Sequence, residues 1–178
     1  EIIAEDLGYM TQSVRDLVAE TGYPGMKVLQ FAFGSGSDNE YLPHNYTPNS
    51  VVYTGTHDNE TLMQYLECTE EHVRNHIREY MNRPHASNEE LCENLIWMAM
   101  SSVGKYCMIP LQDYLGLGKE ARMNYPSTLG HNWEWRVRKE QLTHDLASYI
   151  AHMTGLSYRW RIDPPKEEET NETDTENE

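Results

Sequence analysis

The sequence predicts an α/β fold built on a parallel sheet. Four short apolar runs alternate with segments of helical periodicity, and each run ends in polar residues, which is typical of strands buried on both faces. Such an alternating order favours parallel strands joined by right-handed crossovers. Because a closed eight-stranded barrel takes about 250 residues, these 178 residues are either the C-terminal half of a TIM-like (β/α)8 barrel with helical insertions or a complete open doubly wound sheet.

The expected strands are short and rich in aliphatic and aromatic residues. The first stops at Glu5, the third at Thr54 and the fourth at Pro110. A buried parallel strand stops in this way when it reaches the polar edge of its sheet. The four ranges are 2–4, 26–33, 51–53 and 106–109.

The first helix is expected over residues 9–21. Val14, Leu17 and Val18 fall on one face of this helix, at spacings of three and four residues. Gly22 supplies the stop, because glycine readily adopts the left-handed conformation that ends many helices.

Further helices are expected over residues 60–67, 70–81, 89–102 and 141–154. Two of them carry an apolar stripe at helical spacing, which predicts a face turned to the core. In 89–102 the stripe consists of Leu91, Leu95, Met98 and Ala99. In 141–154 it consists of Leu142, Leu146, Tyr149, Ile150 and Met153.

The charge balance excludes several classes of partner. The chain has 14 Lys and Arg against 29 Asp and Glu, a formal net charge of −15. Such a field repels phosphate backbones and anionic lipids, so nucleic acid is a poor partner. The mean hydropathy is −0.75, and no apolar stretch approaches the roughly 20 residues of a membrane span. A soluble protein with no membrane contact is expected.

The acidic residues are concentrated at the C-terminus. Residues 163–178 hold eight acids and one Lys, so that −7 of the net charge lies in this stretch. It has no aliphatic or aromatic residue and cannot bury enough surface to offset the entropy of ordering. We therefore expect one globular unit over 1–162, followed by a disordered acidic tail.

No metal site or disulfide framework is expected. His72 and His76 have a helical spacing that can bind zinc, but Val73 stands where H-E-x-x-H has its Glu. The cysteines are odd in number and lack C-x-x-C spacing; they are Cys68, Cys92 and Cys107. A reducing cytoplasm is the location that three unpaired cysteines favour.

The opening residues have neither an initiator Met nor the features of a signal peptide, so they are expected to be the interior of a longer chain.

Candidate reactive side chains follow the first and third strands. Glu5 ends one strand, and His57 and Asp58 follow the other. Because the carboxyl ends of parallel strands meet at one rim, these side chains are expected to lie close together. Two carboxyl groups in different environments are what cleavage of an acetal requires. The bare pair is weak evidence, since carboxylates at such positions also serve as helix caps.

Longer stretches of sequence point to a family. The words IIAEDLG, KVLQFAF, NSVVYTGTHDNET, PLQDYLGLGKEARMNYPST and NWEWR occur in this order. From residue 1 to about residue 160, the chain resembles the amylomaltase family, the 4-alpha-glucanotransferases also called disproportionating enzymes. The resemblance implies a TIM-like barrel that transfers alpha-1,4-glucan segments by a retaining double displacement. The acceptor is the 4-hydroxyl of glucose or a maltooligosaccharide, and no metal or organic cofactor is implied.

The resemblance also assigns roles to individual residues. Glu5 in EDLG matches the general acid/base, and Asp58 in THDN matches the carboxylate that holds and distorts the sugar ring. His57 matches a neighbouring donor to sugar hydroxyls. Asn124 in RMN, and less closely the loop around Asp38, match positions near the bound glucan.

The aromatic NWEWR segment is expected to act chiefly in packing. Its large side chains are read as closing the barrel, with stacking on a sugar ring as the alternative. These residues are Trp133, Trp135 and Arg136.

One departure from the family pattern concerns the nucleophile. The family carries it as an Asp in an Arg-x-Asp-His motif before EDLG, and this sequence contains no such motif. Residues 161–164 have only its first letters and follow the last helix. The chain is therefore expected to be a C-terminal fragment, inactive alone. Alternatives are a non-catalytic glucan-binding remnant and an alpha-glucan hydrolase of the alpha-amylase group.

Overall fold

The computed structural model describes residues 2–160 and contains a small parallel sheet. Its strands are β1 (Gly25–Val28), β2 (Ser50–Tyr53) and β3 (Tyr106–Met108), in the order β1-β2-β3. Met26 pairs with Val51, and Val51 with Tyr106. The predicted α/β class with parallel strands is confirmed. The acidic tail over 163–178 and the 161–164 motif lie outside the described residues.

The expected strand at residues 2–4 is wrong, because this segment does not pair as a ladder. Ala4 N donates to the carbonyl oxygen of Pro24 at 3.0 Å, but the next donor on β1, Met26 N, binds the Asp6 side chain at 2.7 Å. Gly25 permits this approach, since a Cβ there would lie 2.3 Å from Asp6 Oδ2. A carboxylate thus occupies the place of a strand carbonyl.

The second expected strand is also shorter than predicted. After Val28 the chain leaves the sheet in a 3-10 turn, η1 (Leu29–Phe31), closed by Ala32 N donating to the Leu29 carbonyl at 3.0 Å. Leu29, Ala32 and Phe33 remain buried. The apolar run therefore continues into the core without continuing as a strand.

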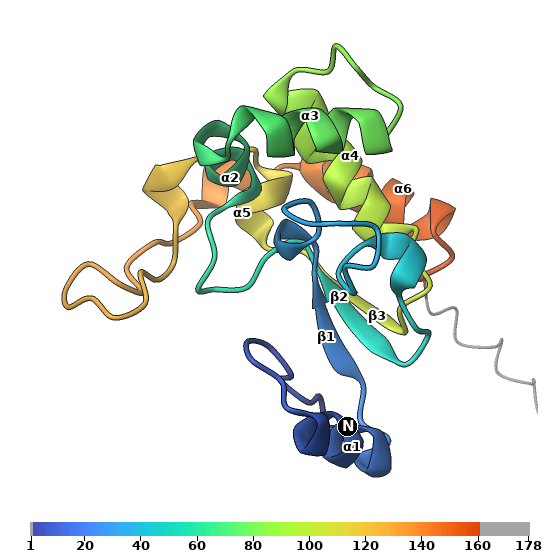
Figure 1. Ribbon diagram of the computed structural model, residues 1–178. Coiled ribbons are helices and arrows are strands. Elements are labelled where there is room, and N and C mark those ends of the chain that lie inside the picture. Colours follow the sequence, from blue (N-terminus) through green and yellow to red (C-terminus); the bar gives the residue numbers. More distant parts are fainter. Residues whose placement is uncertain (1, 161–178) are drawn as a thin grey trace, which may run out of the picture.

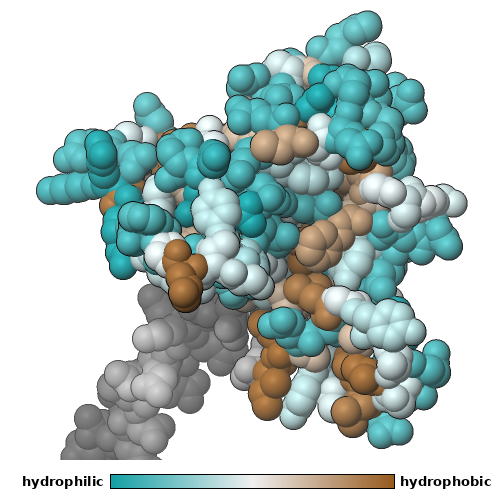
Figure 2. Space-filling view, turned by 60° about the vertical axis from the view of Figure 1, so that its left-hand side comes forward, coloured by the Kyte–Doolittle hydropathy of each residue, from teal (hydrophilic) through white to brown (hydrophobic). Residues whose placement is uncertain are grey.

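The first helix, α1 (Gln12–Thr21), ends at Gly22 as predicted, with a left-handed φ of 66°. It begins three residues later than expected, and the face that carries Val14, Leu17 and Val18 is not buried. Val14 and Leu17 are 40% and 58% exposed, and α1 has no buried residue. In Figure 1, α1 lies at the opposite end of β1 from α2 and α3. Figure 2 shows apolar surface on this lower part of the molecule.

The remaining helices follow the predictions within a few residues: α2 (Leu62–Cys68), α3 (Glu71–Tyr80), α4 (Asn88–Met100) and α6 (His144–Leu156). A short helix, α5 (Leu111–Tyr114), was not predicted, nor were three further 3-10 turns, η2 (Pro43–Asn45), η3 (Lys119–Ala121) and η4 (Lys139–Gln141). Helix α6 starts late because Thr143 caps it, its hydroxyl accepting from Leu146 N at 3.1 Å. Leu142 therefore lies outside the helix and is 56% exposed, contrary to its place in the expected stripe.

The core lies where α2, α3 and α4 pack over the sheet and η1. Helix α4 packs against α2, α5 and α6, and of its predicted stripe only Met98 is not fully buried. Ser87 and Glu90 form a capping box at the start of α4, which satisfies two otherwise free backbone donors. Fully buried members of the core include Leu29, Val52, Leu62, Leu66, Ile77, Leu91 and Leu95.

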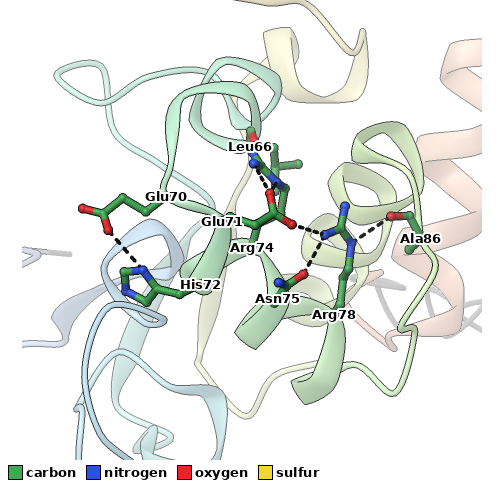
Figure 3. Close-up of polar contacts among 8 residues, drawn as sticks. All are labelled: Leu66, Glu70, Glu71, His72, Arg74, Asn75, Arg78 and Ala86. Atoms are coloured by element: carbon green, nitrogen blue, oxygen red, sulfur yellow. Dashed lines mark hydrogen bonds and ion pairs between the residues drawn. The ribbon is translucent and has the colours of Figure 1, made fainter.

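Charged side chains of α3 tie this helix to its neighbours (Figure 3). Glu71 pairs with Arg74 and Arg78. Arg74 also donates to the carbonyl oxygen of Leu66, and Arg78 Nε donates to that of Ala86 at 3.1 Å. These arginines thereby satisfy carbonyls at the end of α2 and in the loop before α4.

The two histidines of α3 do not converge on a common ligand position. His72 pairs with Glu70, with Nδ1 at 3.1 Å from Oε2. His76 Nδ1 lies 3.0 Å from the Phe33 carbonyl oxygen. Across residues 2–160, no group of three or more His, Cys, Asp or Glu side chains is placed to hold a metal ion. Over the same residues, no helix has the length and apolar character to cross a membrane.

Candidate active site

A cavity of about 520 Å³ opens beside the ends of the strands. Glu5 lines it from the N-terminal segment, and His57 and Asp58 line it from the loop after β2. The structure thus brings together the three side chains that topology placed at one rim. Apolar side chains form much of the remaining wall: Ile3, Leu7, Met26, Tyr53, Met108 and Ile109.

The loop of residues 54–62 sets the direction of His57 and Asp58. Asn59 Oδ1 accepts from both the backbone N and the hydroxyl of Thr56, each at 2.9 Å. Gly55 lies against Gln30, so closely that a Cβ would be 2.5 Å from Gln30 Nε2. The tight turn therefore presents the two side chains at its exposed tip, next to the cavity.

Two side chains contact the Asp58 carboxylate, one through a hydrogen bond and one as an ion-pair neighbour. Asn124 Nδ2 donates to Asp58 Oδ1 at 2.7 Å, and His57 Nε2 lies 3.3 Å from the same oxygen. The Asp58 side chain is 50% exposed. Three of the predicted site residues thus form one polar cluster. The second carboxylate oxygen of Asp58, Oδ2, has no partner among residues 2–160.

Arg122 supports this group and was not singled out from the sequence. Its guanidinium donates to the Asp58 carbonyl oxygen at 2.9 Å, to the Asn124 carbonyl oxygen at 3.0 Å and to Glu60 Oε1 at 2.6 Å. The guanidinium also stacks 4.3 Å from the ring centroid of Tyr125. Arg122 stands two residues before Asn124 in the same sequence word, RMN, and this position was the available signal.

Trp133, which was expected to act chiefly in packing, has its ring next to that of His57. The two ring centroids are 5.0 Å apart at an angle of 41°, and Trp133 is 50% exposed. Its backbone has a positive φ of 66° and donates to the Met123 carbonyl oxygen at 2.7 Å. The residue is therefore held at the surface next to the site and not in the core. Asp38 is exposed and does not line this cavity.

Asp113 on α5 is a buried carboxylate that the sequence prediction missed. It is 3% exposed, and its oxygens accept from Thr54 Oγ1 at 2.6 Å and from Leu62 N at 2.8 Å. Burial raises the pKa of Asp113 to about 6, against the lowering effect of the two hydrogen bonds. Its place in the word PLQD offered a signal, but only the tertiary structure relates it to residues 54–62.

The sequence of this chain matches one family over most of its length. Residues 1–143 match the model of the Glyco_hydro_77 family, described as 4-alpha-glucanotransferase. The chain belongs to this family. The resemblance stated from its sequence words is thereby confirmed.

Individual relatives carry the same name. The chain is 45% identical over 157 residues to the 4-alpha-glucanotransferase of Clostridium butyricum, covering 88% of this chain and 32% of that protein. It is 46% identical over 136 residues to the chloroplastic/amyloplastic 4-alpha-glucanotransferase of Solanum tuberosum, covering 76% and 23%. The chain thus spans about a third or less of the length of these relatives.

A solved structure is similar in fold. An amylomaltase from Streptococcus agalactiae in complex with acarbose superposes with a TM-score of 0.83 at 35% identity, covering 89% of this chain and 32% of that one. In the present chain, residues of the words EDLG and THDN line the same cavity. The word RMN contacts THDN through the hydrogen bond from Asn124 to Asp58.

Proposed function

We propose that the intact protein is a 4-alpha-glucanotransferase that acts on maltooligosaccharides and alpha-1,4-glucans. The observation that carries the proposal is the convergence of Glu5, His57 and Asp58 on one cavity in a chain of this family. The acarbose complex of a similar structure supports an alpha-glucan ligand. The reaction is transfer of a glucan segment to the 4-hydroxyl of glucose or a maltooligosaccharide.

In this proposal Glu5 is the general acid/base. It protonates the departing glycosidic oxygen in the first step, and in the second it removes the proton from the acceptor hydroxyl. Retention requires a carboxylate nucleophile between the two steps. We assign this role to no residue among 2–160 and expect a family-type Arg-x-Asp-His motif to supply it in the intact protein. On that ground these 178 residues alone are expected to be inactive.

Asp58 and His57 hold the sugar ring that is cleaved. Asp58 Oδ1 is already occupied by Asn124, so Oδ2 is the oxygen available to accept from sugar hydroxyls. His57, next to it and 57% exposed at its side chain, donates to a neighbouring hydroxyl. Hydrogen bonds that strengthen as the ring distorts lower the barrier for forming the oxocarbenium-like transition state.

The parallel sheet is proposed to form one side of a TIM-like barrel, of which this chain is the C-terminal half. Two features support this view. The similar amylomaltase is about three times as long as the matched part. Ile2 and Ile3 beside β1 are 58% and 37% exposed, and further strands of a barrel would cover such apolar side chains.

We also propose that the intact protein is located in a reducing compartment such as the cytoplasm. All three cysteines are free thiols. Burial raises the pKa of Cys92 to about 12, which keeps that thiol protonated and unreactive.

The decisive experiment follows maltotriose incubated with the intact protein and with its Glu5→Gln variant. Release of glucose together with maltopentaose and longer products, at a constant number of reducing ends, is the expected result. Glu5→Gln is expected to keep affinity for maltotriose and to lower kcat by a factor on the order of 10² to 10⁴. The matched control is Glu20→Gln on the exposed face of α1.

Other outcomes separate the alternatives. An increasing number of reducing ends would instead identify a hydrolase, and binding without turnover would identify a glucan-binding module. A fully active Glu5→Gln protein would reduce Glu5 to a structural residue.

A further inference from the structure

The loop that carries His57 and Asp58 is fastened at both ends by a single carboxylate. Thr54, directly after β2, donates its hydroxyl to Asp113 Oδ2 at 2.6 Å. Leu62, the first residue of α2, donates its backbone N–H to Asp113 Oδ1 at 2.8 Å. Asp113 thus joins the start and the end of the loop. These two bonds fix the distance between the ends of the loop, whose tip carries His57 and Asp58.

Two other residues also restrain the loop: Gln30 spans it from Thr54 to Glu60, and Arg122 holds its tip. Gln30 N donates to the Thr54 carbonyl oxygen at 3.3 Å, and Gln30 Nε2 donates to that of Glu60 at 2.9 Å. Arg122 holds the tip through the Asp58 carbonyl oxygen. Among these restraints, only Asp113 binds with charge-assisted hydrogen bonds in a buried setting, where such bonds are strongest.

A buried carboxylate at this position lowers the free energy of unfolding, so a functional reason for its presence is expected. Asp113 and Thr54 are 3% and 0% exposed, and burial of a charge without a cationic partner is unfavourable. With its pKa raised to about 6, Asp113 is ionised at pH 7. The titratable groups facing it are the Cys92 thiol from α4, 3.7 Å from the Asp113 carbonyl oxygen, and those lining an adjoining cavity of about 220 Å³. The latter are His57, Glu60 and Arg122.

We propose that Asp113 is a positioning residue for the reaction, which fixes the loop of residues 54–62 so that His57 and Asp58 meet the sugar ring in the productive geometry. It acts through the loop and does not touch the substrate. The inference rests on the proposed function and adds a residue to its machinery. Small displacements of positioned groups are costly for turnover, which is why a destabilising charge is retained here.

The test is Asp113→Asn in the intact protein. The amide keeps the volume, can accept from Leu62 N and can donate to Thr54 Oγ1, but both bonds lose their charge assistance. We expect kcat for maltotriose disproportionation to decrease about tenfold or more, as for other residues that orient a functional group, with KM changed less than threefold. The midpoint of thermal unfolding at pH 7 is expected not to decrease. A purely structural role would lower the midpoint along with the rate.

A double-mutant cycle with Asp58→Asn provides the sharper readout. If Asp113 acts through Asp58, Asp113→Asn should cost less than about twofold in kcat once Asp58 is already Asn. The control is Asp145→Asn in the first turn of α6, which is expected to leave kcat unchanged in both backgrounds. An equal loss in both backgrounds, or a kcat for Asp113→Asn within twofold of the unmodified protein, would overturn the proposal.

Two further measurements test the proposal if Asp113→Asn does not fold or if the intact protein is inactive. If Asp113→Asn does not fold, Thr54→Val removes one of the two bonds at nearly constant volume, and Thr54→Ser restores it. The proposal requires a lower kcat in Thr54→Val and recovery of kcat in Thr54→Ser, and equal rates in the two variants would contradict it.

If the intact protein does not disproportionate maltotriose, the proposed function fails. Hydrogen exchange at the amides of residues 55–61 then decides about Asp113, with exchange about tenfold faster in Asp113→Asn expected and equal exchange contradicting it.

Discussion

Asn124 and Asp58 are joined by a 2.7 Å hydrogen bond although 66 positions separate them in the chain. The amide nitrogen donates to Oδ1 of the carboxylate, and Oδ2 has no partner among residues 2–160. The Asn124 backbone is itself held, because its carbonyl oxygen accepts from Arg122 Nε at 3.0 Å. Asn124 therefore orients Asp58 in the free protein.

Replacing Asn124 by Ala is expected to lower kcat/KM for maltotriose by about tenfold or more. A hydrogen bond to a charged group contributes about 1.5–3 kcal/mol, and its loss lets the Asp58 carboxylate rotate away from its productive orientation. Steady-state kinetics of the intact protein provide the measurement. Asn94→Ala, which removes a local bond to the Glu90 carbonyl oxygen on α4, is the control. Equal losses in both variants would contradict the role of Asn124.

Asp113 is expected to make folding stability depend on pH in a defined direction. Its pKa is about 6 in the folded state and about 3.9 when unfolded. As pH increases from 4 to 6, the unfolded state releases this proton first, so the contribution of Asp113 to the free energy of unfolding decreases across that window and is level above it. The decrease is on the order of 2–3 kcal/mol.

Urea unfolding of Asp113→Asn at pH 4 and pH 7.5 measures this effect. The variant lacks the titration, so its stability relative to the unmodified protein should increase between the two pH values by on the order of 2–3 kcal/mol. Asp145→Asn serves as the reference for general pH effects. A relative stability of Asp113→Asn that is flat, or that decreases with pH, would show that the carboxylate is not destabilised by burial.

Trp133 is expected to contribute to glucan binding from its place over His57. Its exposed ring, centred 5.0 Å from the imidazole, offers an apolar face to a sugar ring. Trp133→Ala should increase KM for maltotriose about fivefold, equivalent to about 1 kcal/mol, and Trp133→Phe should recover most of the affinity. Trp160→Ala, a change at another exposed Trp, is the control. An unchanged KM for Trp133→Ala would contradict sugar stacking and would favour the alternative that Trp133 acts in packing.

The centre of the core is expected to be sensitive at Leu95. This side chain on α4 is 1% exposed and belongs to the cluster between the helices and the sheet. Leu95→Ala should lower the free energy of unfolding by about 2–5 kcal/mol through lost burial and a cavity. Chemical denaturation of the intact protein tests this. Leu129→Ala, at a fully exposed position, should stay within about 0.5 kcal/mol of the unmodified protein.

Local signals in the sequence determined much of the fold and part of the site. Helix α4 was predicted within two residues at each end, because its apolar stripe is encoded within one segment. The end of α1 at Gly22 follows from the backbone freedom of glycine. Glu5 and Asp58 were expected at one rim, and both line the same cavity, although residues 2–4 do not form the strand on which the expectation for Glu5 rested.

Only the tertiary structure decided features that depend on a partner distant in the chain. Residues 2–4 have the composition of a strand, yet a ladder needs a neighbour, and the Asp6 carboxylate takes the donor on Met26. The apolar face of α1 is likewise encoded locally, but burial requires an opposing surface, and none among residues 2–160 covers it. Asp113 and Arg122 gain their roles from contacts with residues 54–62. Periodicity and composition describe one segment at a time, whereas hydrogen-bond partners and burial are set when segments far apart in sequence pack together.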